Sequence, residues 1–148
     1  MRKVALIDYS SSSVSLLIAK TEGSVMESIL HTRTPLSFAG SVYQDRKLTE
    51  IEIPELLDIT DSFIITCKEN GVSNLYAIAS ANLASVKGID DILALVTEKT
   101  GLGIYKLDMA TEAEARIFAN ERYSILPHST LIDFGSITTK IYSFSDYI

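Results

Sequence analysis

Two stretches near opposite ends of the chain almost repeat one another, and this repeat constrains the fold more than any other feature. The first is ALIDYSSSSVSLLIA at residues 5–19, and the second is TLIDFGSITTKIYSF at residues 130–144. Each runs from an apolar segment through Ile-Asp-aromatic and small residues into a second apolar segment, which predicts two strands joined by a short turn. An aspartate followed by small polar residues is typical of a phosphate-holding turn, although a plain polar hairpin has the same pattern. Two copies favour duplicated halves that hold a phosphate between them.

The segments between the two repeats alternate between helical and strand patterns. Apolar residues from Ile53 onward recur at helical spacing, with Pro54 in the first turn and Gly71 after the end, which predicts a helix. Thr111 and Glu114 have the spacing of a capping box and predict the start of another helix. The remaining predictions are strands at 3–8, 14–19, 25–33, 74–80 and 104–108, helices at 88–101 and 111–123, and a strand pair at 129–144. This order predicts an α/β fold with helices on the faces of a mixed sheet.

Composition excludes several classes of function. The chain has 148 residues and a formal net charge of -6, which argues against broad binding to nucleic acid or to an anionic membrane. Its single cysteine and two histidines make a cysteine or histidine metal cluster unlikely, so any metal would be held by carboxylates. No apolar run approaches the roughly 18 residues of a membrane-spanning helix. We therefore expect a cytoplasmic protein.

The two turns, together with TEAEARI at residues 111–117, resemble the Ppx/GppA family of exopolyphosphatases and guanosine pentaphosphate phosphohydrolases. This family lies within the actin-like superfamily. The resemblance implies an actin-like (ribonuclease H-like) lobe at 1–126 with a mixed five-stranded sheet. It also implies that residues 127–148 form the hairpin that begins a second lobe.

The first turn follows the family pattern Asp-x-Gly-Ser-Asn-Ser in part. Asp8, Ser11 and Ser13 match, whereas Ser10 and Ser12 replace the glycine and the asparagine. Because glycine permits close approach of the backbone to a phosphate, its loss weakens the expected cradle.

The second turn departs further from the family pattern Asp-x-Gly-Gly-Gly-Ser-Thr-Glu. Asp133, Gly135 and Thr139 match. The departures are Ser136 and Ile137 for glycines, Thr138 for serine and Lys140 for glutamate. In addition, Ala84 stands where the family has an arginine that contacts phosphate.

The resemblance also implies roles for individual residues. Glu114 would be the catalytic base, and Asp8 and Asp133 would hold Mg²⁺. The phosphate would be bound by Ser11, Ser12, Ser13, Gly135, Ser136, Thr138 and Thr139. The substrate would be polyphosphate or a guanosine polyphosphate. Glu114 has an equal alternative explanation as a member of the capping box.

Two classes of function remain open. The chain is either a phosphoanhydride hydrolase lobe that needs a second lobe, or a degenerate regulatory or interaction module that forms a homodimer through its strand edges. The departures at Ser10, Ala84, Ile137 and Lys140 favour the second class for this chain alone. An adaptor lobe of actin-like cell-division or pilus-assembly proteins shares the strand pattern and ranks third.

Overall fold

The computed structural model describes residues 2–23, 25–36, 52–119, 128–134 and 139–145. The chain divides into two compact units, Met1–Lys106 and Leu107–Ile148. The predicted boundary between two lobes, at 126/127, stays a prediction. The boundary between the two compact units comes earlier in the chain, because the helix at 109–118 belongs to the same unit as the hairpin.

The first unit is built on a mixed sheet. Among the described residues this sheet has five strands in the order β3-β2-β1-β4-β5. The neighbours β1–β2 and β2–β3 are antiparallel, whereas β1–β4 and β4–β5 are parallel. The strands are β1 (Arg2–Ser10), β2 (Ser13–Glu22), β3 (Val25–Pro35), β4 (Asn74–Ala79) and β5 (Tyr105–Lys106). The predicted α/β fold with a mixed sheet is confirmed.

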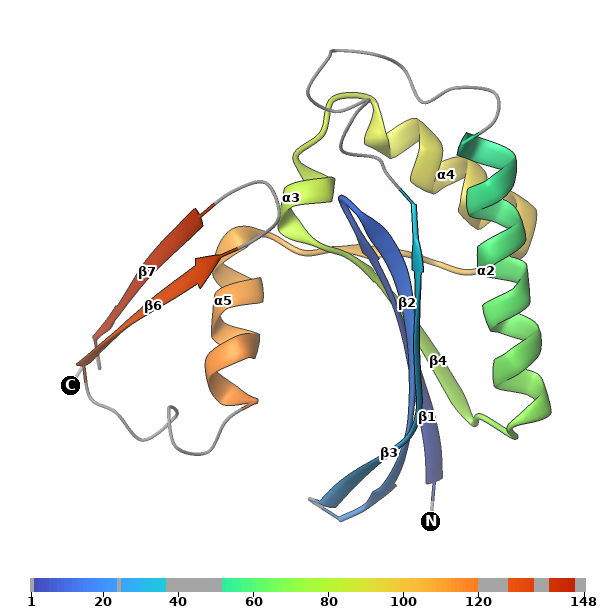
Figure 1. Ribbon diagram of the computed structural model, residues 1–148, viewed down its shortest axis with the longest axis horizontal. Helices are drawn as coiled ribbons and strands as arrows, with labels where there is room; N and C mark the ends of the chain where they lie inside the picture. The colour runs from blue at the N-terminus through green and yellow to red at the C-terminus, as the bar shows by residue number, and fades with distance from the viewer. Residues whose placement is uncertain (1, 24, 37–51, 120–127, 135–138, 146–148) are drawn as a thin grey trace. The chain divides into compact units, whose positions relative to one another are not determined.

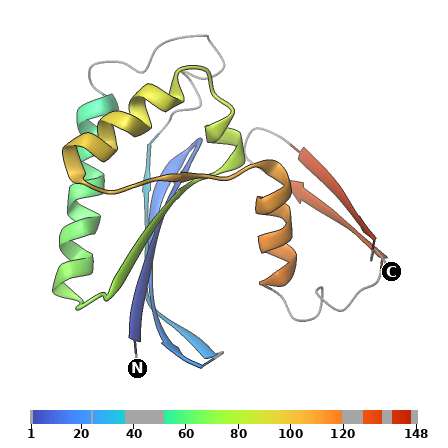
Figure 2. The same ribbon diagram turned by 180° about the vertical axis from the view of Figure 1, so that it is seen from behind.

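Two helices cover one face of this sheet (Figures 1 and 2), namely α2 (Glu52–Glu69) and α4 (Ile89–Thr100). Alternation along β1 and β2 directs one apolar set toward them, and Ile7, Tyr9 and Leu16 are fully buried. From α2 the same core receives Leu56 and Phe63. None of the described helices has the length and apolar character needed to cross a membrane.

A buried hydrogen bond links β1 to α2. The Tyr9 hydroxyl lies 3.0 Å from the hydroxyl of Thr60, which also donates to the Leu56 carbonyl at 2.8 Å. Burial raises the pKa of the Tyr9 phenol to about 12, opposed by the bond to Thr60 and assisted by the charge of Asp61. Tyr9 therefore folds as a neutral phenol.

One of the helices after β4 was predicted from the sequence, and another was not. The predicted helix at 88–101 is confirmed as α4, which ends at Gly101 with φ +72°, a conformation that glycine adopts without strain. A short helix, α3 (Ala81–Ala84), was not predicted. It follows β4 directly, and the Ser80 hydroxyl accepts from the Leu83 amide.

The second unit combines helix α5 (Met109–Phe118) with the hairpin β6 (His128–Phe134) and β7 (Thr139–Ser145). The two strands are antiparallel, with Ile132 opposite Ile141 and Asp133 opposite Lys140. The predicted strand pair is confirmed.

The predicted start of α5 at a Thr111–Glu114 capping box is wrong. The N-cap is Asp108, whose carboxylate accepts the Thr111 amide at 2.7 Å. This bond lowers the pKa of Asp108. Aspartate is a strong N-cap and stands three residues before Thr111, so the helix begins one turn earlier than the box predicted.

Candidate functional site

The serine turn joins β1 to β2 through two residues. Ser10 and Ser13 are the last paired residues, so Ser11 and Ser12 alone form the turn. The Ser10 hydroxyl donates to the Ser13 carbonyl at 3.0 Å and lies 3.0 Å from the Ser13 hydroxyl. The hydroxyl groups therefore form a connected set.

An arginine from the neighbouring strand joins this set. Arg33 of β3 donates from Nε to the Ser13 hydroxyl at 2.8 Å and from Nη2 to the Ser12 hydroxyl at 3.2 Å. A guanidinium carries five N–H groups in a fixed fork that matches phosphate oxygens. Arg33 therefore places a cation at this turn, although Ala84 stands where the Ppx/GppA pattern has its arginine. We define Ser10, Ser12, Ser13 and Arg33 as the serine-arginine cluster.

Asp8 lies on the same sheet face as this cluster. It pairs with Ser15 across β1–β2, and Ser15 pairs with Arg33 across β2–β3. Side chains on one rung of a sheet point to the same face, and strands are about 4.8 Å apart, so Asp8 and Arg33 sit roughly 10 Å apart at the backbone. Asp8 is half-buried and its Oδ1 is buried. The first turn thus combines an acid, hydroxyls and a base on the face opposite α2.

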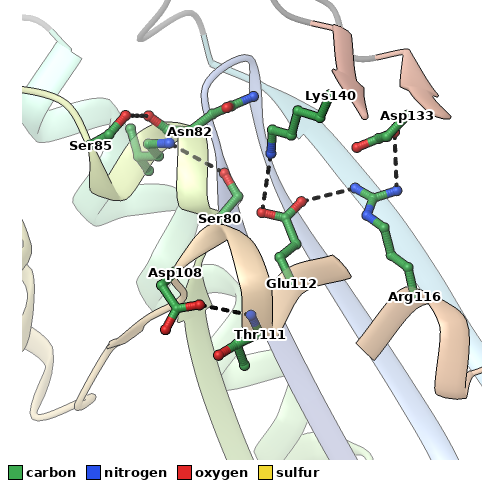
Figure 3. Close-up of polar contacts among 10 residues, drawn as sticks. Ser80, Asn82, Ser85, Asp108, Thr111, Glu112, Arg116, Asp133 and Lys140 are labelled. Carbon is green, nitrogen blue, oxygen red and sulfur yellow. Dashed lines mark hydrogen bonds and ion pairs between the residues drawn. The ribbon is translucent and has the colours of Figure 1, made fainter. Parts of the chain in front are cut away.

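In the second unit, α5 presents Glu112 to the hairpin (Figure 3). Glu112 Oε1 accepts from Arg116 Nη2 at 3.0 Å, and its Oε2 lies 3.5 Å from Lys140 Nζ. Glu114, two residues later on a 3.6-residue helix, is exposed. Its role as the base stays a prediction, whereas the carboxylate that contacts the hairpin is Glu112.

The ion pairs continue to the aspartate of the second turn. Arg116 Nη1 lies 3.5 Å from Asp133 Oδ1 (Figure 3). Burial lowers the pKa of Arg116, but the bond to Glu112 and the charges of Asp133 and Glu112 outweigh it and leave this pKa raised. We define Glu112, Arg116, Asp133 and Lys140 as the hairpin ion network. It contains two carboxylates and two cations, so its formal charge sums to zero.

These residues do not suit a divalent metal at Asp133. Mg²⁺ requires ionised oxygen ligands with room for water, whereas both carboxylates of the network already face a cation. Within the described ranges, no group of three or more His, Cys, Asp or Glu side chains could hold a metal ion. Asp8 belongs to the other compact unit, and a metal site shared by Asp8 and Asp133 stays a prediction.

The remaining predicted site residues have different outcomes. Ser11 in the first turn and Ser13 at the start of β2 are buried, and Ser12 contacts Arg33. Gly135, Ser136 and Thr138 lie outside the described residues. Thr139 begins β7, where it pairs with Phe134 and is exposed.

Four participants were not predicted from the sequence, namely Arg33, Glu112, Arg116 and Lys140. A helical wheel that began at the Asp108 cap could have found Glu112, because Glu112 and Arg116 are four residues apart and share a face. No signal marked Arg33, because its distance from the turn depends on the register between β2 and β3, which shifts at Ile18/Ala19.

Solved structures with a similar fold are known. A Ppx/GppA family member from Aquifex aeolicus matches with a TM-score of 0.82 and 24% identity, over 99% of this chain and 48% of that chain. An exopolyphosphatase from Cytophaga hutchinsonii matches with a TM-score of 0.75 and 16% identity, over 97% of this chain and 50% of that chain.

The fold is that of the Ppx/GppA phosphatases. This confirms the resemblance drawn from the two turns at the level of the fold. The ethanolamine utilization protein EutJ from Carboxydothermus hydrogenoformans is less similar to the chain, with a TM-score of 0.57 and 14% identity over 98% of this chain and 48% of that chain. The chain thus spans about half the length of these Ppx/GppA structures and of EutJ. No family model and no curated protein matches the sequence.

Proposed function

We propose that the chain is a Ppx/GppA-like lobe that binds a phosphoanhydride, polyphosphate or a guanosine polyphosphate, at the serine-arginine cluster. The observation that carries this proposal is the pair of hydrogen bonds from Arg33 to Ser12 and Ser13. These bonds hold a guanidinium at the turn that corresponds to the family's phosphate-binding turn.

Charge supports an anion at this place. The chain has a net charge of -6, so a phosphate needs a local cation to approach it. Arg33 is exposed, which leaves its fork open to solvent beyond the serine hydroxyls. Charge-assisted bonds from a guanidinium to phosphate oxygens are about twice as strong as neutral hydrogen bonds.

Titration calorimetry of the whole chain with tripolyphosphate, pyrophosphate and guanosine tetraphosphate tests the proposal. We expect saturable binding of at least one of these anions to the wild type. Arg33→Ala should weaken binding by about ten-fold or more, the equivalent of one charge-assisted contact. Arg33→Lys should restore part of the affinity, because it keeps the charge but not the fork.

Arg2→Ala is the matched control. Arg2 bonds Asn74 at the other end of β1 and its removal changes the net charge by the same amount. Equal loss of affinity in Arg33→Ala and Arg2→Ala would mean that only the net charge matters and would contradict a site at Arg33. Absence of binding to the wild type would overturn the proposal.

We further propose that hydrolysis by this chain alone is weak. Both oxygens of Glu112 face cations, which leaves it poorly placed to take a proton from water, and Glu114 is exposed on α5. Phosphate release from tripolyphosphate by the wild type, Glu112→Gln and Glu114→Gln tests this. Substantial turnover that is lost only in Glu114→Gln would restore Glu114 as the base.

A second candidate function is an interaction module, favoured by a different observation. Three large apolar residues on the outer face of the hairpin, Ile132, Phe134 and Ile141, are exposed. We propose that this face and the strand edges support self-association. Sedimentation velocity should show a concentration-dependent dimer that Phe134→Ser weakens, and a monomer at every concentration would contradict it.

A further inference from the structure

Lys140 is a nearly buried cation on the inner face of the hairpin. Alternation along β7 places Lys140, Tyr142 and Phe144 on the opposite face from the exposed Ile141. Only 9% of Lys140 is exposed, although lysine is almost never found buried without a partner. The burial of this ammonium therefore needs a compensating charge.

The compensation comes from both carboxylates of the hairpin ion network. Lys140 Nζ lies 3.5 Å from Glu112 Oε2, and Lys140 stands directly opposite Asp133 in the strand pairing. Arg116 bridges the same two carboxylates from the helix side, with contacts at 3.0 and 3.5 Å (Figure 3). Each acid is thus matched by a base.

Two largely buried carboxylates that contact the same guanidinium need positive charge beside them. Glu112 and Asp133 are both largely buried, and two ionised acids in such a place repel one another unless a positive charge intervenes. A divalent ion would provide that charge from solution, whereas Lys140 provides it from the chain itself.

We propose that the ammonium of Lys140, with the guanidinium of Arg116, takes the place of a divalent cation at Glu112 and Asp133, so that this site is closed to metal. The inference depends on contacts within the second unit alone and does not require the phosphate binding proposed above. It predicts that a single change of charge at residue 140 opens a metal site.

Mn²⁺ binding to the whole chain, followed by electron paramagnetic resonance and calorimetry, tests this inference. Lys140→Glu removes the ammonium and sets a third carboxylate beside Glu112 and Asp133. We expect this variant to bind Mn²⁺ at least about ten-fold more tightly than the wild type, as expected when a ligand joins a metal site. Adding Asp133→Asn to Lys140→Glu should remove the gain.

Matched variants separate this site from other carboxylates. Adding Glu114→Gln to Lys140→Glu should keep the gain, because Glu114 is exposed and outside the network. Lys140→Met removes the charge without adding a ligand and should gain less than Lys140→Glu. The inference is overturned if Lys140→Glu binds no more tightly than the wild type.

A second test leaves Lys140 unchanged and starts from the wild type. Its residual Mn²⁺ binding should be the same in Asp133→Asn. Wild-type binding that is lost in Asp133→Asn but retained in Glu114→Gln would show that a metal already occupies the site and would overturn the inference.

Discussion

The two hairpins share a sequence pattern but differ in what surrounds them. In the first, Ile7 and Tyr9 are both 0% exposed beneath α2, whereas the corresponding Ile132 and Phe134 of the second are 50% and 79% exposed. In both, the aspartate between them lies on the opposite face: Asp8 shares that face with Arg33 of β3, and Asp133 lies 3.5 Å from Arg116 of α5. The pattern therefore determines strands and the face of each aspartate, while burial depends on neighbouring elements that the pattern does not encode.

The largest expected difference between the hairpins concerns their isoleucines. Ile7→Ala should destabilise the first unit by about 2–5 kcal/mol, because a fully buried side chain leaves a cavity. Ile132→Ala, the same change at the corresponding place, should cost less than about 1 kcal/mol, because that side chain is half exposed. Hydrogen exchange resolved along the chain by mass spectrometry measures both. Equal losses would mean that the outer face of the second hairpin is covered in solution.

The next effect concerns Tyr9 at alkaline pH. Its pKa is raised from 10.0 to about 12, so folding favours the neutral phenol. The stability that this provides is complete below pH 10 and is lost as the pH rises through 12, by about 2–3 kcal/mol in total. Urea unfolding of wild type and Tyr9→Phe between pH 9 and 12 measures it.

Tyr9→Phe should lack this loss, and its fold should tolerate the change because Thr60 keeps its bond to the Leu56 carbonyl. Phe134→Tyr places a phenol at the corresponding exposed position and should add no pH dependence to stability. A wild type and a Tyr9→Phe variant with the same alkaline profile would contradict the assignment.

A smaller effect distinguishes the two glutamates of α5. Glu112→Gln leaves Arg116 and Lys140 with Asp133 as their one remaining carboxylate in the network, and should destabilise the second unit by about 1–2 kcal/mol. Glu114→Gln makes the same change on an exposed side chain and should stay within about 0.5 kcal/mol. Thermal unfolding at low and high salt measures both. If Glu114→Gln proved the more damaging, Glu112 would not be the residue that holds the hairpin.

The sequence predicted the architecture well because strand alternation and helix periodicity are local. The mixed sheet, α2, α4 and both hairpins followed from spacing of apolar residues. The start of α5 was missed because Thr111–Glu114 matches a capping box while Asp108, three residues earlier, is the cap that forms. Local rules give more than one start, and here the aspartate cap is the one that forms.

The candidate site was only partly predictable. Asp8 and the serines were found because they lie within one motif. Arg33 and Lys140 were not assigned roles, because one depends on the register of β3 against β2 and the other on which face of β7 meets α5. Contacts between segments far apart in sequence are set by register and packing, and one sequence alone does not reveal them.

We propose that the first turn binds phosphate through Arg33, whereas Asp133 of the second hairpin is neutralised by side chains of its own unit. Calorimetric titration of the wild-type chain with tripolyphosphate, in parallel with Mg²⁺ and with EDTA, tests it most directly. We expect saturable binding in both solutions, lost in Arg33→Ala and retained in Arg2→Ala. Absence of binding, or binding that appears only with Mg²⁺ and is lost in Asp133→Asn, would contradict it.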